Sequence, residues 1–316
     1  MNVNSNYKTY VFKGKPRHNA TGIDGVVVFI VITKGKAMSR ILGVIPARLE
    51  STRLPRKLLL AETGKPLIVH TIEQAKKSHL LDEVVVATGD QEIADVCKEY
   101  CQVILTEEDH QNGTSRIAEA VRLKNRRSIM ERPDVVVNIQ GDEPEISPRS
   151  IDRLVAHMLD ERPRVATLAT PARNTGDLGS SDRVKVAITH NCEAMMFSRS
   201  LIPFPIGTAI NEEVLSLQYP HNPMLIHIGV YAYTYLALQE FARYKQSSLE
   251  KSERLEQLRF LQYGDTIKVV IVPESHSGID TAEDYKAFVC RCKTRAVIYS
   301  HIERAFTRHT SARTAD

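Results

Sequence analysis

Three basic side chains follow the first strongly apolar segment of the chain. Residues 41–45 (ILGVI) predict a buried strand, and Arg48, Arg53 and Lys57 lie in the loop after it. Open α/β sheets bind ligands at the carboxyl ends of their strands. Arginine can grip two phosphate oxygens at once, and lysine supplies a point charge. The loop therefore predicts a phosphate-binding site, with a solvated basic loop as the alternative, although it has neither a GxxxxGK(S/T) nor a GxGxxG pattern.

Two carboxylates could add a divalent cation to this site. Asp142 follows the apolar run 134–139, within the stretch QGDEP, and should face the basic loop. Mg²⁺ prefers oxygen ligands and keeps several waters, so two protein oxygens from separate loops are enough. Asp280 lies between a predicted strand and a predicted helix, where its local sequence favours a helix N-cap over a metal ligand. The residues alone leave the metal-binding and non-metal interpretations of Asp142 open.

The elements that must position these side chains alternate between short apolar strands and helices. Strands are predicted at 41–45, 83–87, 103–105 and 134–139, and helices at 66–78, 91–100 and 115–124. Continuous apolar runs separated by helices indicate a mainly parallel sheet with helices on both faces. The predicted fold class is therefore α/β.

The second half of the chain has a less regular pattern. It predicts strands at 165–169, 184–188, 226–233 and 267–272, two of them antiparallel, and helices at 236–244, 252–262 and from Thr281. The stretch 199–225 contains four prolines and is predicted to form an arm. We expect a single domain over residues 38–290 and a basic C-terminal tail over 291–316.

Composition and charge narrow the class of protein. The chain has 316 residues, 42% of them hydrophobic and 25% charged, which is enough apolar material for a core. Its longest apolar run, residues 26–32, is far shorter than the ~20 residues that span a bilayer, so a membrane-spanning protein is excluded. The net charge is +4, but residues 1–37 alone carry six basic side chains and one acidic one. The remainder is slightly acidic, which argues against a nucleic-acid partner.

The first 37 residues indicate how the chain begins, and the cysteines indicate the cellular compartment. Met38 directly precedes the first predicted strand, so we expect residues 1–37 to be a non-native or disordered leader, with a weak signal peptide as the less favoured alternative. The five cysteines are an odd number without zinc-site spacing, and free thiols in a reducing cytoplasm are the expectation.

Six motifs in order along the chain resemble those of one enzyme family. They are PARLESTRLPRKLL, DHQNGTSRIAEA, VVNIQGDEP, HIGVYAY, LEQLRFLQYG and GIDTAED. Together they resemble the 3-deoxy-manno-octulosonate (Kdo) cytidylyltransferases over about residues 40–290. The resemblance implies a Rossmann-like nucleotide-diphospho-sugar transferase fold and a cytoplasmic homodimer. It also implies Mg²⁺-dependent transfer of a cytidylyl group from CTP to Kdo, which activates Kdo for lipopolysaccharide biosynthesis.

The resemblance also implies roles for individual residues. The nucleotide-binding set would be Ala47, Arg48, Ser51, Arg53, Lys57, Thr114 and Arg116. The sugar-binding set would be Gln140, Arg199, His227, Tyr231, Glu256 and Gln257, with Arg199 a partner for the sugar carboxylate. Asp142 and Asp280 would hold Mg²⁺, which overrides the N-cap interpretation of Asp280, and Lys57, Arg48, Asp142 and Asp280 would be catalytic.

Some residues depart from the family pattern or have another interpretation. Ser115 replaces an acidic residue of the motif HQxGTER, and Gly89 interrupts ATD before Asp90, which puts the base-contacting loop in doubt. Without the resemblance, His227 on an apolar strand would be read as a core histidine. The alternative functions are the same reaction on a sialic acid, or nucleotide binding without catalysis.

Overall fold

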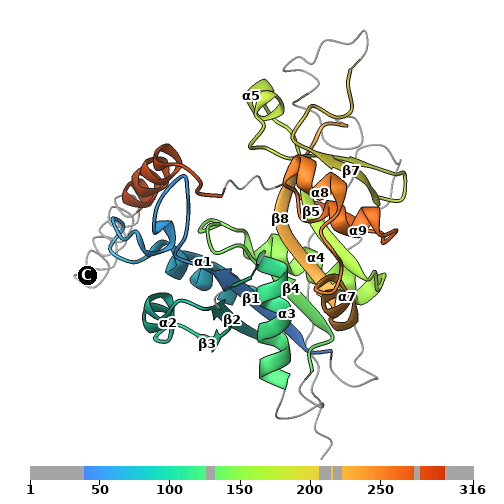
Figure 1. Cartoon of the computed structure of the whole chain (residues 1–316). Helices are drawn as coiled ribbons and strands as arrows, with labels where there is room; N and C mark the ends of the chain where they lie inside the picture. Colours follow the sequence, from blue (N-terminus) through green and yellow to red (C-terminus); the bar gives the residue numbers. More distant parts are fainter. Residues whose placement is uncertain are drawn as a thin grey trace, which may run out of the picture. The chain divides into compact units, whose positions relative to one another are not determined.

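A single mixed sheet forms the centre of the computed structural model (Figure 1). The structure describes residues 39–107, 109–110, 112–125, 132–205, 215, 223–273 and 278–295. Its strands are β1 (Ile41–Ala47), β2 (Glu83–Thr88), β3 (Gln102–Leu105), β4 (Val135–Asn138), β5 (Val165–Pro171), β6 (Lys185–Ile188), β7 (Ala194–Ser198), β8 (Leu225–Thr234) and β9 (Lys268–Ile271). The main path is β3-β2-β1-β4-β8-β5-β9. The predicted leader 1–37 lies outside the described residues.

Strand direction within the sheet is parallel except at β8 and the short extension beside it. β1 pairs in parallel with β2 and β4, β2 with β3, and β5 with β9. β8 is antiparallel to both β4 and β5, and β6 and β7 extend the sheet from β8 as an antiparallel pair. The predicted α/β class with a mainly parallel sheet and an antiparallel excursion is confirmed.

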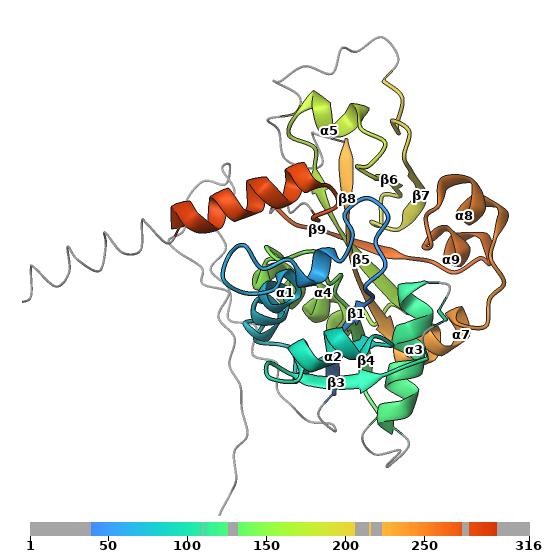
Figure 2. The same ribbon diagram turned by 60° about the vertical axis from the view of Figure 1, so that its left-hand side comes forward.

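Helices cover both faces of the sheet. They are α1 (Leu67–Lys76), α2 (Gln91–Cys97), α3 (Gly113–Lys124), α4 (Pro148–Asp160), α5 (Thr175–Gly179), α7 (Tyr235–Phe241), α8 (Ser248–Glu253), α9 (Leu258–Gln262) and a helix over 282–295, besides the 3-10 turn η1 (Lys57–Leu59). In β1, Ile45 packs into the cluster that contains α1, α2 and α4, whereas Val44 packs into the cluster of α3 and α7. This alternation follows from the two-residue period of a strand. Figure 2 shows α1 and α4 side by side.

Several elements differ from the sequence prediction. The predicted helix 252–262 is two helices, α8 and α9, because Arg254 adopts a left-handed backbone conformation with φ 53°. α4 and β7 were not predicted. Pro66 precedes α1 as its N-cap residue rather than lying in its first turn.

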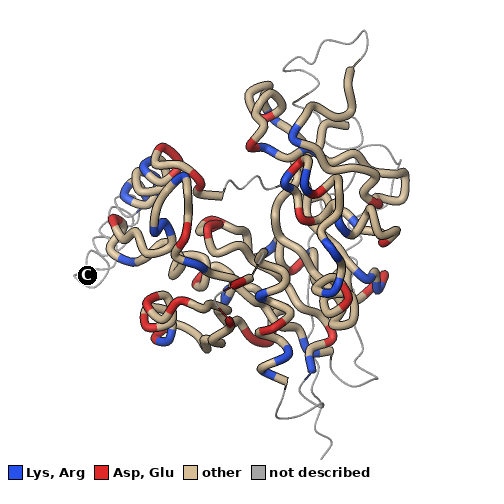
Figure 3. The backbone as a smooth tube through the Cα atoms, in the orientation of Figure 1, with Lys and Arg blue, Asp and Glu red and all other residues tan. Residues whose placement is uncertain are grey.

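The last described helix passes the predicted domain boundary at residue 290. Arg291 and Arg295 on this helix form ion pairs of 2.6 and 2.8 Å with Glu145, so the part of the predicted basic tail that is described is a packed helix. Most of the predicted arm 199–225 lies outside the described residues. No helix within the described ranges combines the length and apolarity needed to cross a membrane. Acidic and basic residues are interspersed along the described chain (Figure 3).

Candidate active site

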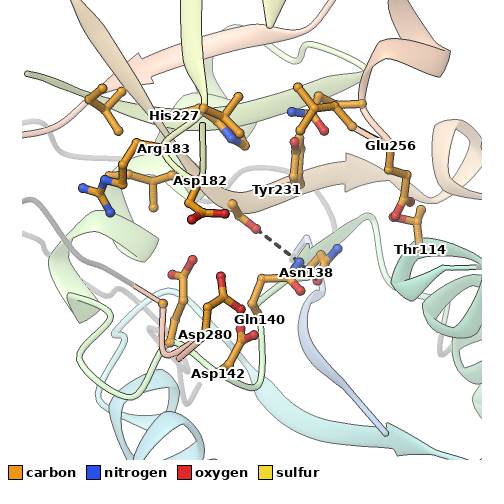
Figure 4. A pocket seen from close by; sticks show the side chains of 18 of the residues that line it. Thr114, Asn138, Gln140, Asp142, Asp182, Arg183, His227, Tyr231, Glu256 and Asp280 are labelled. Atoms are coloured by element: carbon orange, nitrogen blue, oxygen red, sulfur yellow. Dashed lines mark hydrogen bonds between the residues drawn. The ribbon is translucent and has the colours of Figure 1, made fainter. Parts of the chain in front are cut away.

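Two adjoining cavities lie at the carboxyl edge of β1 and β4. The first, of about 310 Å³, is bounded by the loop after β1 and the start of α3, and we call it the loop cavity. The second, of about 370 Å³, lies against β4 and β8 and is called the sheet cavity. Gln140, Asp142 and Asp280 line both. Figure 4 shows these three side chains close together at one side of the sheet cavity. Ligands in the two cavities would therefore meet at the carboxylates.

Lys57 holds the two shared carboxylates together. Its Nζ donates to Asp142 Oδ2 at 2.5 Å, to Asp280 Oδ1 at 2.9 Å and to the Ile279 carbonyl at 2.9 Å. Burial alone would lower the pKa of Lys57, but the charges and hydrogen bonds of Asp142 and Asp280 outweigh that effect and raise it. Lys57 is thus a fixed cation. The N-cap role that the local sequence suggests for Asp280 is wrong, because Thr281 Oγ1 accepts from the Asp284 N–H at 3.1 Å while Asp280 binds Lys57.

Close packing of the two loops fixes the floor of the loop cavity. A Cβ atom on Gly141 would lie 3.3 Å from the Pro46 carbonyl oxygen and 3.4 Å from Leu58. Glycine therefore lets the loop after β4 approach the loop after β1. This contact brings Asp142 into reach of Lys57 although the two residues are far apart in the sequence.

The other predicted cations also line the loop cavity. Arg53 bridges Asp182 at 2.9 Å and Asp280 at 3.0 Å, with half of its side chain exposed. The buried Arg116 donates to Thr106 Oγ1 at 2.7 Å and to the Glu107 carbonyl at 3.1 Å, and burial lowers its pKa. The remaining predicted residues on this side are Ala47, Arg48 and Ser51.

The two departures from the family motifs are accommodated locally. Asn112 caps α3 by accepting from the Ser115 N–H at 2.8 Å, and the Ser115 hydroxyl donates to the Asn112 carbonyl at 2.9 Å. Despite Gly89, Asp90 Oδ2 accepts from the Leu49 N–H at 2.9 Å. Asp90 therefore still ties the end of β2 to the basic loop.

Buried polar groups line the sheet cavity. Thr114, predicted on the nucleotide side, lines this cavity and faces Glu256 (Figure 4). Burial raises the pKa of Glu256 to about 7, against smaller opposing effects of Thr114 and Arg259. Glu256 Oε1 is buried and has no hydrogen-bond partner among the described residues. Gln140 donates to the Gly229 carbonyl at 3.3 Å, and Gln257 is also buried at the cavity wall.

His227 belongs both to the aromatic core and to the cavity wall. Its ring contacts those of Phe197 and Tyr231, with centroids 5.0 and 5.4 Å away, and its Nε2 lies 3.0 Å from Thr167 Oγ1. Burial lowers the pKa of His227 to about 3, so the ring is neutral. His227 and Tyr231 both line the sheet cavity, as a sugar-binding role requires.

Arg199 enters the sheet cavity from the end of β7. Its Nε donates to the Glu253 carbonyl at 2.8 Å and its Nη1 to the Ser181 carbonyl at 2.8 Å. Sequence reasoning missed its neighbour Arg183, which lines the same cavity.

Glu143 is a second residue that the sequence reasoning left without a role. It is only 7% exposed, lines the sheet cavity, and has no hydrogen-bond partner for Oε2 among the described residues. Burial, and then the charge of Asp142, raise the pKa of Glu143 to about 8. Its position in QGDEP, next to Asp142, was the available signal.

Comparison with known proteins assigns the chain to a family. The cytidylyltransferase family model matches residues 42–267. A 3-deoxy-manno-octulosonate cytidylyltransferase of Parabacteroides distasonis is 42% identical over 252 residues, which are 78% of this chain and 96% of that protein. The chain belongs to the 3-deoxy-manno-octulosonate cytidylyltransferase family.

Further relatives agree with this family assignment. The enzyme of the same name from Syntrophobacter fumaroxidans is 40% identical over 252 residues, 79% of this chain and 96% of that protein. A solved structure of CMP:2-keto-3-deoxy-manno-octonic acid synthetase complexed with CTP superposes with a TM-score of 0.68 at 34% identity, and the match covers 83% of this chain and all of that one. The range matched by the cytidylyltransferase model contains every predicted site residue except Asp280.

Proposed function

We propose that this member of the Kdo cytidylyltransferase family transfers the cytidylyl group of CTP to Kdo, forming CMP-Kdo and pyrophosphate. The observation that carries the proposal is the pair of adjoining cavities, one lined by cations and one by buried polar groups, which share Asp142 and Asp280. Family membership at about 40% identity over nearly the full length of the relatives names the reaction.

The loop cavity is the proposed CTP site. Ala47, Arg48, Ser51, Arg53, Lys57 and Arg116 would surround the nucleotide there. The anomeric hydroxyl of Kdo attacks the α-phosphorus and gives up its proton to solvent, the bond from that phosphorus to the bridging oxygen breaks, and pyrophosphate leaves. Lys57 and Arg48 would neutralise the negative charge that develops on the leaving pyrophosphate, which is the main demand of such a transfer.

Asp142 and Asp280 fit a Mg²⁺ ion. Both carboxylates contact Lys57 Nζ, at 2.5 and 2.9 Å, so they lie close together, at a position that Lys57 Nζ occupies here. Carboxylate oxygens are the ligands that Mg²⁺ prefers, and the ion needs only a few of them from the protein. We propose that these two residues hold Mg²⁺, which when bound neutralises and orients phosphate oxygens.

The sheet cavity is the proposed Kdo site. Arg199 would pair with the sugar carboxylate, while Gln140, His227, Tyr231, Glu256 and Gln257 would contact the hydroxyl groups. His227 would act as a neutral hydrogen-bonding group, because its pKa is lowered to about 3. Thr114, from the first turn of α3, would link this site to the nucleotide loop.

The first test is pyrophosphate release by the full chain from CTP and Mg²⁺, with Kdo and N-acetylneuraminate as separate sugars. We expect release with Kdo only. Release with N-acetylneuraminate alone would move the substrate to a sialic acid, and CTP binding without release would favour a binding protein. In the variant Asp142→Asn, turnover should fall by about 10²–10³-fold with much less effect on CTP binding. Normal turnover of this variant would contradict the role of Asp142.

Four further features, drawn from the family resemblance and from the sequence itself, are also proposals. We propose a homodimer acting in the cytoplasm, without a nucleic-acid or membrane partner, and we propose that residues 38–316 suffice for activity. Light scattering on the purified chain tests the first. Comparing the turnover of the full chain with that of residues 38–316 tests the last.

A further inference from the structure

Among the largest fully buried side chains of the described residues is a lysine, Lys185, at the start of β6. Its ammonium group donates to the carbonyl oxygens of Ser180 at 2.8 Å, Arg183 at 2.6 Å and Arg199 at 2.6 Å. A lysine ammonium has three N–H donors, so these carbonyls satisfy it completely. A buried cation is costly unless it is hydrogen-bonded or paired, and here backbone carbonyls do that.

The three acceptors belong to two separate segments. Ser180 and Arg183 lie in the turn before β6, and Arg199 follows β7. Lys185 therefore joins the main chains of both segments through a single atom. Burial, and then the charge of Arg199, lower the pKa of Lys185, while the charge of Glu253 opposes this effect.

Both arginines joined by Lys185 line the sheet cavity. Arg183 also pairs with Asp177 at 3.3 Å, and the Arg199 main-chain N–H donates to Glu253 at 3.0 Å. Figure 4 places Arg183 across the cavity from Asp142 and Asp280. Arg183 and Arg199 thus supply the basic side chains of the sheet cavity, while Asp182, beside Arg183, and Asp142 and Asp280 on the opposite side are acidic.

The two arginines are the groups of this cavity that can attract the carboxylate of an anionic sugar. Holding the main chain of two arginines in place limits the positions that their guanidinium groups can reach, which favours the arrangement in which both contact one carboxylate.

We propose that Lys185 is a positioning residue for the sugar acid: it fixes the main chain of Arg183 and Arg199, so that both arginines face the carboxylate bound in the sheet cavity. The proposal rests on the proposed function, since it takes an ulosonic acid as the occupant. Arg183 becomes a carboxylate-binding residue, and Lys185 acts through it and through Arg199 without touching the sugar.

The test is steady-state pyrophosphate release by the full chain with Kdo, CTP and Mg²⁺. In Lys185→Met we expect the KM for Kdo to rise at least about tenfold, while the KM for CTP changes less than about twofold. Lys185→Arg, which keeps the cation, should recover part of the loss. Lys268→Met is the matched control, because this lysine of β9 is also mostly buried, pairs with Glu161 and lines neither cavity. A parallel rise in both KM values would indicate a merely structural role and overturn the proposal.

Arg183→Gln gives a second test that does not depend on the folding of Lys185→Met. It should also raise the KM for Kdo and leave the KM for CTP unchanged. In the double variant Lys185→Arg with Arg183→Gln, the two effects should be less than additive, because Lys185 acts partly through Arg183. An unchanged KM for Kdo in Arg183→Gln, or full additivity, overturns the proposal. Absence of turnover in the unmodified chain would instead contradict the proposed function.

Discussion

The loop cavity and the sheet cavity differ in the segments that line them and in how exposed their lining residues are. The loop cavity takes most of its lining from the stretch 46–58 and the start of α3, and its Arg53 is half exposed. The sheet cavity collects residues from segments between Thr114 and Asp280, and several of them, such as Tyr231 and Gln257, are less than 9% exposed. One side therefore relies on accessible charge, and the other on shape and buried polar groups.

This difference determines how each cavity can select its substrate. A triphosphate is the same in every nucleotide, so a short cationic loop can bind it by charge alone. A sugar acid differs from its relatives by single hydroxyl groups, which a site rejects when its own buried polar groups are left unpaired. We therefore expect substitutions in the loop cavity to affect CTP, and substitutions around the sheet cavity to affect the sugar.

The largest effect is expected where the two cavities meet. Lys57→Met should lower turnover by about 10³-fold, because it removes the cation that contacts both Asp142 and Asp280 and that would neutralise the leaving pyrophosphate. Rapid-quench measurement of single-turnover product formation checks this. Arg56→Gln is the control, since Arg56 pairs with Glu92 and lines neither cavity. If the turnover of Lys57→Met stayed within tenfold of the wild type, the proposed role of Lys57 at the junction of the two cavities would be wrong.

A buried ion pair behind the sheet cavity should give the next effect. Arg259 donates to both carboxylate oxygens of Glu250 at 2.6 and 2.7 Å, and it supports the turn that presents Gln257. Arg259→Met leaves Glu250 buried without its cation, which should cost about 3 kcal/mol of unfolding free energy. The KM for Kdo should rise more than the KM for CTP. Urea denaturation measures the loss, and Lys98→Met, which removes an exposed partner of Asp95, should leave the midpoint nearly unchanged.

The loop cavity alone is tested by Arg48. Arg48→Gln should raise the KM for CTP about tenfold, or about 1.4 kcal/mol, and leave the KM for Kdo unchanged. The difference from wild type should shrink at high salt, because the lost interaction is ionic. Initial rates over a range of CTP and salt concentrations check this, with Lys65→Gln outside both cavities as the control. An equal rise in both KM values would contradict the assignment of CTP to the loop cavity and of the sugar to the sheet cavity.

The last prediction is a pH dependence of stability in the ligand-free protein. The pKa of Glu256 is raised from 4.5 to about 7, so the folded state keeps a proton that the unfolded state has lost. The stabilising contribution of the protonated carboxyl is therefore complete below pH 4.5 and is lost as the pH rises to about 7. Glu256→Gln should reduce the change in unfolding free energy between pH 4.5 and 7, which urea denaturation at a series of pH values would measure. The same slope in both proteins would mean that Glu256 titrates normally.

Much of the sheet was predictable because its strands are runs of buried β-branched residues. β4 and β5 have no exposed position, which gives the continuous apolar signal of a covered sheet. β7 reads Ala194-Met-Met-Phe-Ser198 without a β-branched residue, and it pairs only within the antiparallel extension, so propensity alone did not reveal it. α4 carried usable signals, a Ser147 cap followed by Pro148 and a buried face, which the prediction overlooked.

The loop cavity could be predicted from its own residues to a greater extent than the sheet cavity. Arg48, Arg53 and Lys57 of the loop cavity all follow one strand, so their chemistry could be inferred from their types and spacing. The members of the sheet cavity are single residues on distant segments, and only the family resemblance named them. Lys185 and Glu143 escaped both approaches, because the burial of a charged side chain depends on tertiary packing that no local pattern records.

The direction of β8 has a consequence for how substrate preference can change. Because β8 runs against β4 and β5, His227 and Tyr231 reach the cavity from within the strand rather than from a loop beyond its end. Insertions and deletions are tolerated in loops but shift every following side chain of a strand to the opposite face. The part of the sugar-facing surface that β8 supplies can therefore diverge only by point replacement at fixed positions, whereas the loop after β1 is free to change in length. Descendants of this chain would alter the β8 side of the sugar site one side chain at a time.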